Sequence, residues 1–552
     1  FNRTDAAWPS DRNELDDIWR KRVKNDILTL RLNGKSAEEI NKTLRRRYQG
    51  VKRRTEQLAS NDIFQTFINA YTLSLEPHTS YMSPRVSENF DISMRLSLEG
   101  IGAVLRNENE YTEVLSTVPG GPAALSGKVK TGDRIVGVGQ GVDGEIIDVV
   151  GWRLQDVVDQ IRGPKGSTVR LRIQKEETGA GGPDEEIVLI RNEIKLEDQA
   201  AKKTIIEGLD DLGPVRIGVI DVPAFYRDFK GQSDGDKNFR STTRDVRQLL
   251  KELQQERVDG IVIDLRENGG GSLIEATELT GLFIPSGPVV QVRDASGDVE
   301  IEKDPDPETV YAGPLAVLVD RNSASASEIF AGAIQDYHRG IIIGEPTFGK
   351  GTVQTLVDLG RFVRNGGDKL GRLRLTMAQF FRINGGSTQF RGVVPDIIYP
   401  PGSMAEKYGE RELDNALPWA QIEAADYRPR GQTPIEKYRV NHERRINNDA
   451  GFKFLSEENA YLKKMRDSKV VSLLESKRKA EWEKREAERK AGKNRFRIAL
   501  GLPPAAEDDQ DAENSGDDSQ KDLDGIDRIM INEAARILSD YIGDQRQAVM
   551  VN

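Results

Sequence analysis

The stretch that decides the fold reads VLVDRNSASASEIFAGAIQDYHRGIIIGEPTFGKGTVQ and occupies residues 317–354. Apolar runs at 315–319 and 341–343 enclose a cluster of serines and alanines, from which a helical pattern extends over 328–337. This order predicts a strand, a helix and a second strand, with small residues at the start of the helix. Small residues there let another backbone approach closely, and the free N–H groups of a helix start attract an anion.

A serine at such a helix start can be a nucleophile when a base takes its proton. Along a helix, His338 would lie about 20 Å from Ser325 and Asp336 about 16 Å from it, so neither can touch the serine. Lys350 follows the second strand, which returns to the same end of the sheet. Burial that lowers a lysine pKa from ~10.4 to ~7–8 makes a base, at a cost of about 3–5 kcal/mol to the folded state. Ser325 and Lys350 are therefore the best-placed dyad.

Other interpretations fit the same residues. A Ser/Ala cluster at a helix start is usually an N-cap, and a lysine between glycines is usually a plain loop residue. Residues 344–350 also nearly match a phosphate-binding P-loop, Gly-x4-Gly-Lys. That motif needs Ser or Thr next and must open a helix, whereas Gly351 follows here and residues 353–357 alternate like a strand. We therefore reject a nucleotide site.

Two motifs carry a resemblance to a known family: Asn-Ser-Ala-Ser-Ala-Ser-Glu at 322–328 and Gly-x-x-Thr-x-Gly-Lys-Gly-x-x-Gln at 344–354. They resemble the C-terminal processing (tail-specific) proteases, in the long periplasmic form of Gram-negative bacteria. In that family the middle serine of the cluster is the nucleophile, which implies Ser325 here. The resemblance likewise implies Lys350 as the base and Gln354 as the residue that orients it.

The cluster also contains Ser323 and Ser327, so the choice of Ser325 rests on the resemblance. Four residues of extended strand would separate Lys350 from Gln354 by ~13 Å. The chain must therefore bend between them, and the glycines on both sides of the lysine permit that bend.

A glycine-rich turn, Arg-Glu-Asn-Gly-Gly-Gly-Ser at 266–272, follows an apolar strand at 260–265. Such a turn exposes backbone N–H groups, which an oxyanion hole requires, although a plain tight turn has the same composition. By the resemblance, the two donors are the N–H groups of Gly271 and Ala326. Gly-Val-Val-Pro-Asp at 392–396 matches the closing motif of the family.

Residues 95–178 form a compact, β-rich pattern, in which Gly-Asp-Arg-Ile at 132–135 begins a strand and 152–161 is an amphipathic helix. This resembles a PDZ domain, which binds a peptide as an added strand and holds its free carboxylate with backbone N–H groups. Two further strands, at 169–173 and 187–190, are expected to form a hairpin whose tip lies near 179–183. The carboxylate-binding residues implied by the resemblance are Gly100, Ile101, Gly102 and Ala103.

Composition excludes several classes of protein. With 552 residues, 37% of them apolar and 31% charged, the chain should form about two to four domains. The net charge of −10 argues against a nucleic-acid binder, and no stretch approaches the roughly 18–20 apolar residues of a membrane span. Cysteine is absent, and His78, His338 and His442 are too scattered to suggest a zinc site. We expect neither a metal nor a cofactor.

The two ends of the chain have helical patterns. In the N-terminal region, an apolar face must pack against another element, and His78 is interpreted as a capping or packing histidine. Near the other end, the acid-rich stretch 507–524 predicts a flexible loop, and a final amphipathic helix over 526–541 should pack by its apolar face. The N-terminal apolar face consists of Ile63, Phe64, Phe67, Ile68 and Tyr71.

The sequence thus predicts an α/β protease core with an inserted, mostly β PDZ domain and helical N- and C-terminal regions. The resemblance implies a periplasmic serine endopeptidase that recognises the C-terminal tails of protein substrates through its PDZ domain and cleaves with a Ser/Lys dyad. It implies apolar substrate tails and a lipoprotein adaptor as a candidate partner. The expected domains are a helical region at 1–90, the PDZ domain at 95–178, the Ser/Lys protease core at 185–400 and a helical region at 405–552.

The competing hypothesis is a non-catalytic adaptor, in which the PDZ domain binds tails and the core is an inactive scaffold. A scaffold without catalytic function would have no reason to keep Ser325, Lys350, Gln354 and Gly271 together. The complete set therefore favours the enzyme.

Overall fold

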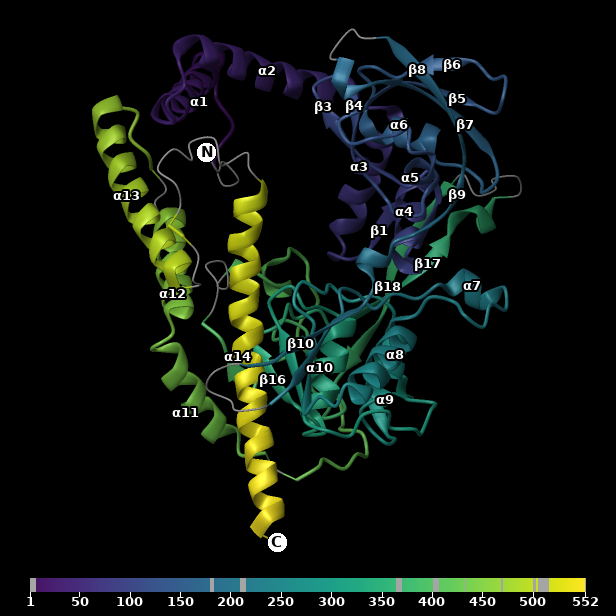
Figure 1. Ribbon diagram of the computed structural model, residues 1–552, viewed down its shortest axis with the longest axis vertical. Helices are drawn as coiled ribbons and strands as arrows, with labels where there is room; N and C mark the ends of the chain where they lie inside the picture. Colours follow the sequence, from purple (N-terminus) through teal and green to yellow (C-terminus); the bar gives the residue numbers. More distant parts are fainter. Residues whose placement is uncertain are drawn as a thin grey trace.

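The structure is a computed structural model. Figure 1 shows the α/β core in its lower half, the PDZ-like sheet at the upper right and the C-terminal helices along the left. The first N-terminal helices cross the top of the molecule. The structure describes residues 6–178, 183–208, 215–363, 370–400, 407–431, 433–467, 470–499, 503–504 and 516–551.

A six-stranded sheet forms the centre of the core, in the order β10-β11-β12-β15-β16-β19. Only β10 is antiparallel to its neighbour, and the other strands run parallel. Every residue of β12 and β15 is buried, as expected of parallel strands covered on both faces. The strands are β10 (Lys202–Ile206), β11 (Ile217–Asp221), β12 (Gly260–Asp264), β15 (Leu315–Val319), β16 (Ile341–Gly344) and β19 (Ile397–Ile398).

Three helices cover one face of this sheet and place the candidate residues. Leu250, Leu279 and Phe330, one from each helix, are fully buried in the same apolar cluster as the facing strand residues. The predicted strand, helix and strand around the serine cluster are confirmed as β15, α10 and β16. The helices are α8 (Thr242–Gln255), α9 (Leu273–Gly281) and α10 (Ala326–Asp336), and the short α7 (Phe229–Ser233) precedes them.

The C-terminal helices cover the opposite face. Tyr438, Phe452 and Leu538 belong to one buried cluster with the second side of the strands, and Figure 1 shows α14 running the length of the core. The predicted final helix is confirmed within α14, but the loop predicted at 507–524 is wrong from 516 onward, where α14 begins. Residues 507–515 lie outside the described residues. These helices are α11 (Ile435–Ile446), α12 (Ala450–Asp467), α13 (Glu475–Ala499) and α14 (Gly516–Val551).

A second, antiparallel sheet of five strands extends from the core. Its longest strand, β18, pairs with β17 on one side and with β1 and β13 on the other. β1 precedes the PDZ-like region in the chain, so the segment around residue 80 is bound into the sheet that follows Lys350. The strands are β1 (Ser80–Met82), β13 (Pro288–Asp294), β14 (Val299–Lys303), β17 (Thr352–Asp358) and β18 (Arg372–Phe381).

The PDZ-like region is a sheet in the order β3-β4-β5-β7-β8, with β6 paired to β5. The predicted hairpin is confirmed by the antiparallel pair β7 and β8, while its tip at 179–182 lies outside the described residues. The sheet therefore continues beyond residue 178. A separate antiparallel pair joins β2 (Ser97–Gly100) to β9 (Asn192–Lys195). The elements of the PDZ-like region are β3 (Ala103–Glu108), β4 (Tyr111–Thr117), α5 (Pro122–Ser126), β5 (Arg134–Gln140), β6 (Ile146–Asp148), α6 (Leu154–Ile161), β7 (Thr168–Gln174) and β8 (Asp184–Ile190).

The N-terminal helices differ from the prediction in how far the apolar face of α3 is covered. In the apolar face of α3, Phe64 contacts the ring of Tyr81, but Ile63 is 60% and Phe67 70% exposed, so the expectation that this face is packed is wrong for most of it. Arg31 of α1 pairs with Glu475 of α13 at 2.8 Å, which links the two ends of the chain. No helix among the described residues is long and apolar enough to cross a bilayer. The helices are α1 (Arg12–Leu32), α2 (Ala37–Glu56), α3 (Ser60–Leu73) and α4 (Pro84–Arg95).

Candidate active site

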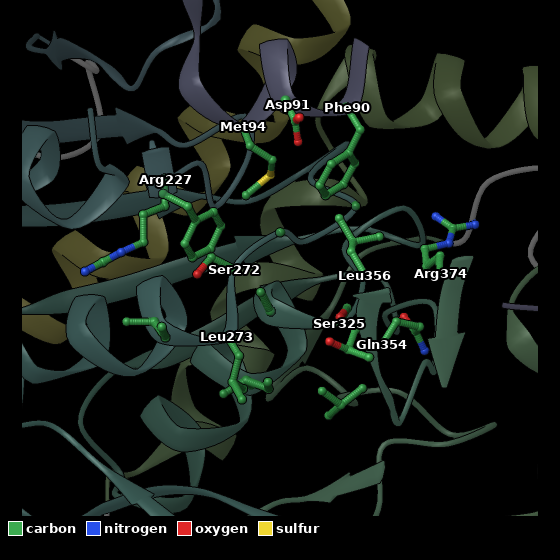
Figure 2. Close-up of a pocket in the computed structure, with 18 of the residues that line it drawn as sticks. Phe90, Asp91, Met94, Arg227, Ser272, Leu273, Ser325, Gln354, Leu356 and Arg374 are labelled. Carbon is green, nitrogen blue, oxygen red and sulfur yellow. The ribbon is translucent and has the colours of Figure 1, made fainter. Parts of the chain in front are cut away.

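Ser325 lies at the sharp turn that leads into α10. Its backbone angles are φ 57° and ψ −110°, which a residue with a Cβ rarely adopts and which costs on the order of 1–3 kcal/mol. The turn is held by the Ser325 N–H, which donates to Oε2 of Glu328 at 2.8 Å. The serine lines a cleft of about 920 Å³, where Figure 2 shows it beside Gln354 and below Leu356. A strained turn that presents a serine to a cleft is typical of a nucleophile.

The structure distinguishes Ser325 from the other two serines of the cluster. Ser323 is fully buried, and its hydroxyl donates to the carbonyl oxygen of Leu265 at 2.8 Å. Ser327 is also fully buried and donates to the carbonyl oxygen of Asn268 at 2.8 Å. Of the three serines, Ser325 alone lines the cleft. The composition of the cluster offered no such distinction, and at the level of sequence only the family resemblance selected Ser325.

Lys350 lines the same cleft from the loop between β16 and β17. Burial, together with the positive charge of Arg374, lowers the pKa of Lys350 to about 8. In the described part of the chain, neither the Lys350 Nζ nor the Ser325 hydroxyl donates a hydrogen bond to another residue. Both groups are therefore free to interact with each other or with a ligand, and catalytic hydrogen bonds often tighten only when substrate is bound.

Glu328 ties the serine turn to the lysine loop, a role that our sequence analysis missed. Its Oε1 accepts hydrogen bonds from the Thr347 hydroxyl at 2.6 Å and the Gly349 N–H at 2.7 Å. Its Oε2 accepts from the N–H groups of Ser325 at 2.8 Å and Lys350 at 3.0 Å. Complete burial raises the pKa of Glu328 to about 7, although these hydrogen bonds oppose the rise. The available sequence signal was a glutamate three residues after a helix-start serine, the spacing of a capping box.

The glycine turn after β12 lies against the serine turn. A Cβ on Gly270 would lie 2.9 Å from the Cβ of Ser325 and 3.1 Å from the nitrogen of Ala326. Gly271 has φ 146°, and a Cβ there would lie 2.2 Å from the carbonyl oxygen of Phe225. Only glycine fits at these two positions. Within the described residues, the N–H groups of Gly271 and Ala326 have no hydrogen-bond partner, so both are available to a ligand in the cleft.

Asn268, also missed by sequence reasoning, fixes the two turns relative to each other. It is fully buried, and its side-chain oxygen accepts from the Gly270 N–H at 2.9 Å. Its carbonyl oxygen accepts from the Ala324 N–H at 3.0 Å. One residue thus supports both the glycine turn and the serine turn. A single asparagine beside glycines gives no sequence signal for this role.

Gln354 lines the cleft from β17, next to an irregularity in strand register between Val353 and Gln354. Its side-chain nitrogen donates to the hydroxyls of Thr352 at 2.9 Å and Thr376 at 3.2 Å. No hydrogen bond joins it to Lys350 among the residues described. All five predicted core residues, Ser325, Lys350, Gln354, Gly271 and Ala326, nevertheless line one cleft.

The two bases rejected on distance are engaged at the far end of α10. Asp336 pairs with Arg382 at 2.6 Å, and Nδ1 of His338 lies 3.3 Å from the carbonyl oxygen of Arg430. Across the described ranges, no group of three or more His, Asp or Glu side chains is placed to hold a metal ion.

The predicted carboxylate-binding residues Gly100 to Ala103 form the connection between β2 and β3. The carbonyl oxygen of Ile101 accepts from the Ala123 N–H at 2.8 Å, which fixes this connection on α5. The outer edge of β3 is unpaired in the described structure, and α6 lies against this strand. An open strand edge beside a helix can accept an extended peptide.

Comparisons with known proteins agree with this architecture. The profile of peptidase family S41 matches residues 216–399, and that of the PDZ domain matches residues 90–174. Profiles of the tail specific protease N-terminal domain and of the C-terminal domain of tail specific protease match residues 1–85 and 404–543.

Individual proteins are similar over most of the chain. The tail-specific protease of Haemophilus influenzae is 42% identical over 548 residues, covering 98% of this chain and 74% of that protein. A carboxy-terminal-processing protease of Bartonella bacilliformis is 33% identical over 369 residues, covering 64% of this chain and 74% of that protein. Among solved structures, the photosystem II D1 C-terminal processing protease is 26% identical, with a TM-score of 0.34, over 64% of this chain and 87% of that chain.

Proposed function

Because this chain belongs to the tail-specific proteases of peptidase family S41, we propose that it cleaves protein substrates with Ser325 as nucleophile and Lys350 as general base. The observation that carries this proposal is the cleft itself. It brings a strained serine and a lysine of lowered pKa together, and one buried carboxylate, that of Glu328, binds the backbone of both. A Ser/Lys dyad needs the lysine neutral, and a pKa of about 8 leaves a usable neutral fraction near neutral pH.

In the proposed mechanism, neutral Lys350 takes the hydroxyl proton as Ser325 attacks the scissile carbonyl carbon. The N–H groups of Gly271 and Ala326 donate to the oxyanion of the tetrahedral intermediate. The lysine then returns the proton to the leaving amine, and an acyl-enzyme remains on the serine. Water, deprotonated by the same lysine, releases the new C-terminus.

Gln354 is proposed to orient Lys350. Because its side-chain nitrogen already donates to Thr352 and Thr376, its side-chain oxygen remains to accept a hydrogen bond from Nζ of the lysine. Both side chains line the same cleft, which allows this bond to form.

Substrate recognition is proposed to lie in the PDZ domain. A substrate tail would extend the sheet along the open edge of β3, and its carboxylate would bind the N–H groups of Gly100, Ile101, Gly102 and Ala103. Half-buried Leu154 and Val158, one turn apart on α6, leave apolar surface on that helix for the side chains of an apolar tail. We also propose a periplasmic location, which the absence of cysteine suits, and a lipoprotein adaptor as partner.

The test is cleavage of an unstructured protein that ends in apolar residues with a free carboxylate. Ser325→Ala and Lys350→Ala should each lose at least about a thousandfold in kcat/KM while still binding the tail. Lys350→Arg should be equally inactive, because arginine stays protonated. His338→Ala, the control, should cleave like the wild type. A Lys350→Ala variant that keeps its activity would refute the dyad.

The same assay tests recognition and the adaptor hypothesis. Amidation of the substrate's C-terminus should weaken its binding, since the carboxylate is the recognised group. A protein that binds tails with the expected preference and cleaves none of them would be an adaptor.

A further inference from the structure

A second chain of side chains, separate from Glu328, supports the lysine loop. His78 does more than pack, because its Nε2 lies 2.9 Å from both carboxylate oxygens of Glu410. Glu410 begins the short helix η6 (Glu410–Glu412) and is 1% exposed. A carboxylate that is buried away from water needs such hydrogen-bond partners. A glutamate at this buried position is therefore expected to do more than fill space.

The chain continues from Glu410 to the residue next to Lys350. Gln389, also 1% exposed, donates from its side-chain nitrogen to Oε1 of Glu410 at 3.1 Å. The side-chain oxygen of Gln389 accepts from the Gly351 N–H at 2.8 Å. The backbone N–H of Glu410 also donates to the carbonyl oxygen of Phe348 at 3.0 Å. Glu410 therefore holds the lysine loop at two points, one on each side of the lysine.

We propose that Glu410, held in place by His78, is a positioning residue for Lys350. The inference rests on the proposed function, in which that lysine is the base. It assigns a role to residues outside the S41 family match, since His78 precedes that match and Glu410 follows it. The N- and C-terminal regions would thus complete the catalytic loop of the core.

The charge of Glu410 gives this role a measurable signature. After burial, the charges that act most on Lys350 are those of Arg374 of β18, which lowers the lysine pKa, and of Glu410, Glu328 and Glu76, which raise it. Removing the charge of Glu410 should therefore lower the pKa of Lys350 and move the acidic limb of the activity profile to lower pH. If Glu410 served only for packing, its replacement would lower activity without moving the acidic limb of the pH profile to lower pH.

The experiment compares Glu410→Gln with Glu412→Gln, an exposed glutamate at the other end of the same short helix. We expect Glu410→Gln to lower kcat about tenfold to a hundredfold, because small displacements of a catalytic group have costs of that size. KM should stay unchanged, and the limb should move to lower pH. Glu412→Gln should behave as the wild type. A Glu410→Gln enzyme with the wild-type kcat and limb overturns the inference.

A second pair of variants covers the case in which Glu410→Gln does not fold. His78→Leu removes the donor to Glu410, whereas His78→Gln keeps a side-chain N–H that can reach it. Folded His78→Leu should lose kcat by a similar factor, and His78→Gln should restore most of it. Equal kcat in His78→Leu and the wild type overturns the inference.

Lys350→Ala, assayed in parallel, separates this inference from the proposed function. If Lys350→Ala is inactive while the Glu410 and His78 variants match the wild type, only the positioning role fails. If Lys350→Ala is active, the proposed dyad fails and the positioning role with it.

Discussion

At the scale of single residues, the behaviour of Lys350 follows from its surroundings. Burial is the main cause that lowers its pKa to about 8, and the neighbouring guanidinium of Arg374 lowers it further. Arg374 is fixed by a hydrogen bond from its Nε to the carbonyl oxygen of His78 at 3.2 Å. Burial lowers the pKa of Arg374 as well, but an arginine remains charged at any pH of interest. The cation thus lowers the lysine pKa further and increases the neutral fraction of Lys350.

This arrangement predicts the pH dependence of cleavage. In the proposed mechanism the neutral lysine is the active form, so kcat/KM should rise with pH through the lysine pKa, near 8 in the free enzyme. Arg374→Gln removes a positive charge, which should raise the lysine pKa and shift that rise to higher pH. Lys230→Gln, an exposed cation that lines the same cleft, is the control and should leave the profile in place. An unchanged profile in Arg374→Gln would show that the guanidinium does not act on Lys350.

At the scale of elements, α14 completes the core instead of forming an appendage. Leu538 and Ile542 of this helix approach Gly260 so closely that a Cβ there would lie 2.9 Å from Ile542 and 3.0 Å from Leu538. Gly260 begins β12, the strand that leads into the glycine turn of the site. On the same face, Asp527 of α14 pairs with Arg266 of that turn at 3.0 Å. The C-terminal helix therefore supports the strand that positions the proposed oxyanion donors.

Truncating one side chain of α14 should destabilise the core. Leu538 is fully buried, so Leu538→Ala should lower the free energy of unfolding by about 2–5 kcal/mol. Gln545→Ala, at an exposed position of the same helix, should change it by less than about 0.5 kcal/mol. Denaturant unfolding followed by a probe in the core measures both. If Leu538→Ala unfolds the helix without affecting the core transition, α14 is a separate unit.

At the scale of the whole molecule, α4 connects the PDZ domain to the cleft of the candidate active site. At one end, Arg85 lies 3.4 Å from Asp156 of α6, the helix beside the proposed peptide site. Further along the helix, Asp91 pairs with Arg372 of β18 at 2.6 Å. Figure 2 shows Phe90, Asp91 and Met94 of α4 along one side of the cleft. One helix therefore contacts both α6 and the cleft, and we expect peptide binding beside α6 to alter the cleft through it.

We expect a saturating apolar tail peptide to speed cleavage of an unrelated substrate that lacks a tail. A tenfold activation requires the peptide to prefer the active arrangement by about 1.4 kcal/mol. Arg85→Ala breaks the contact between α4 and α6 and should reduce this activation, while leaving the rate without peptide unchanged. Glu88→Gln, an exposed position on α4, serves as the control. Full activation in Arg85→Ala would exclude this contact as the connection.

The sequence by itself determined the features that local pattern encodes. Buried parallel strands need continuous apolar runs, so the strand, helix and strand around Ser325 could be predicted from residues 315–343. Spacing and motif resemblance indicated Lys350 and the glycine turn, because both lie in loops that come after predicted strands. Spacing and composition alone could not choose among the three serines of the cluster, since hydroxyl burial depends on neighbours far away in the chain, and only the motif resemblance selected Ser325.

Only the tertiary structure decided which distant segments meet. His78 and Glu410 are 332 residues apart, and α14 reaches β12 from the other end of the chain. Such contacts leave no periodic pattern in the sequence. The residues that flank a buried glutamate or histidine do not differ from those that flank an exposed one. The open face of α3 shows the converse: an amphipathic pattern gives the face of a helix but not whether another element covers it. Local periodicity therefore determined the elements, and long-range packing determined the site that they build.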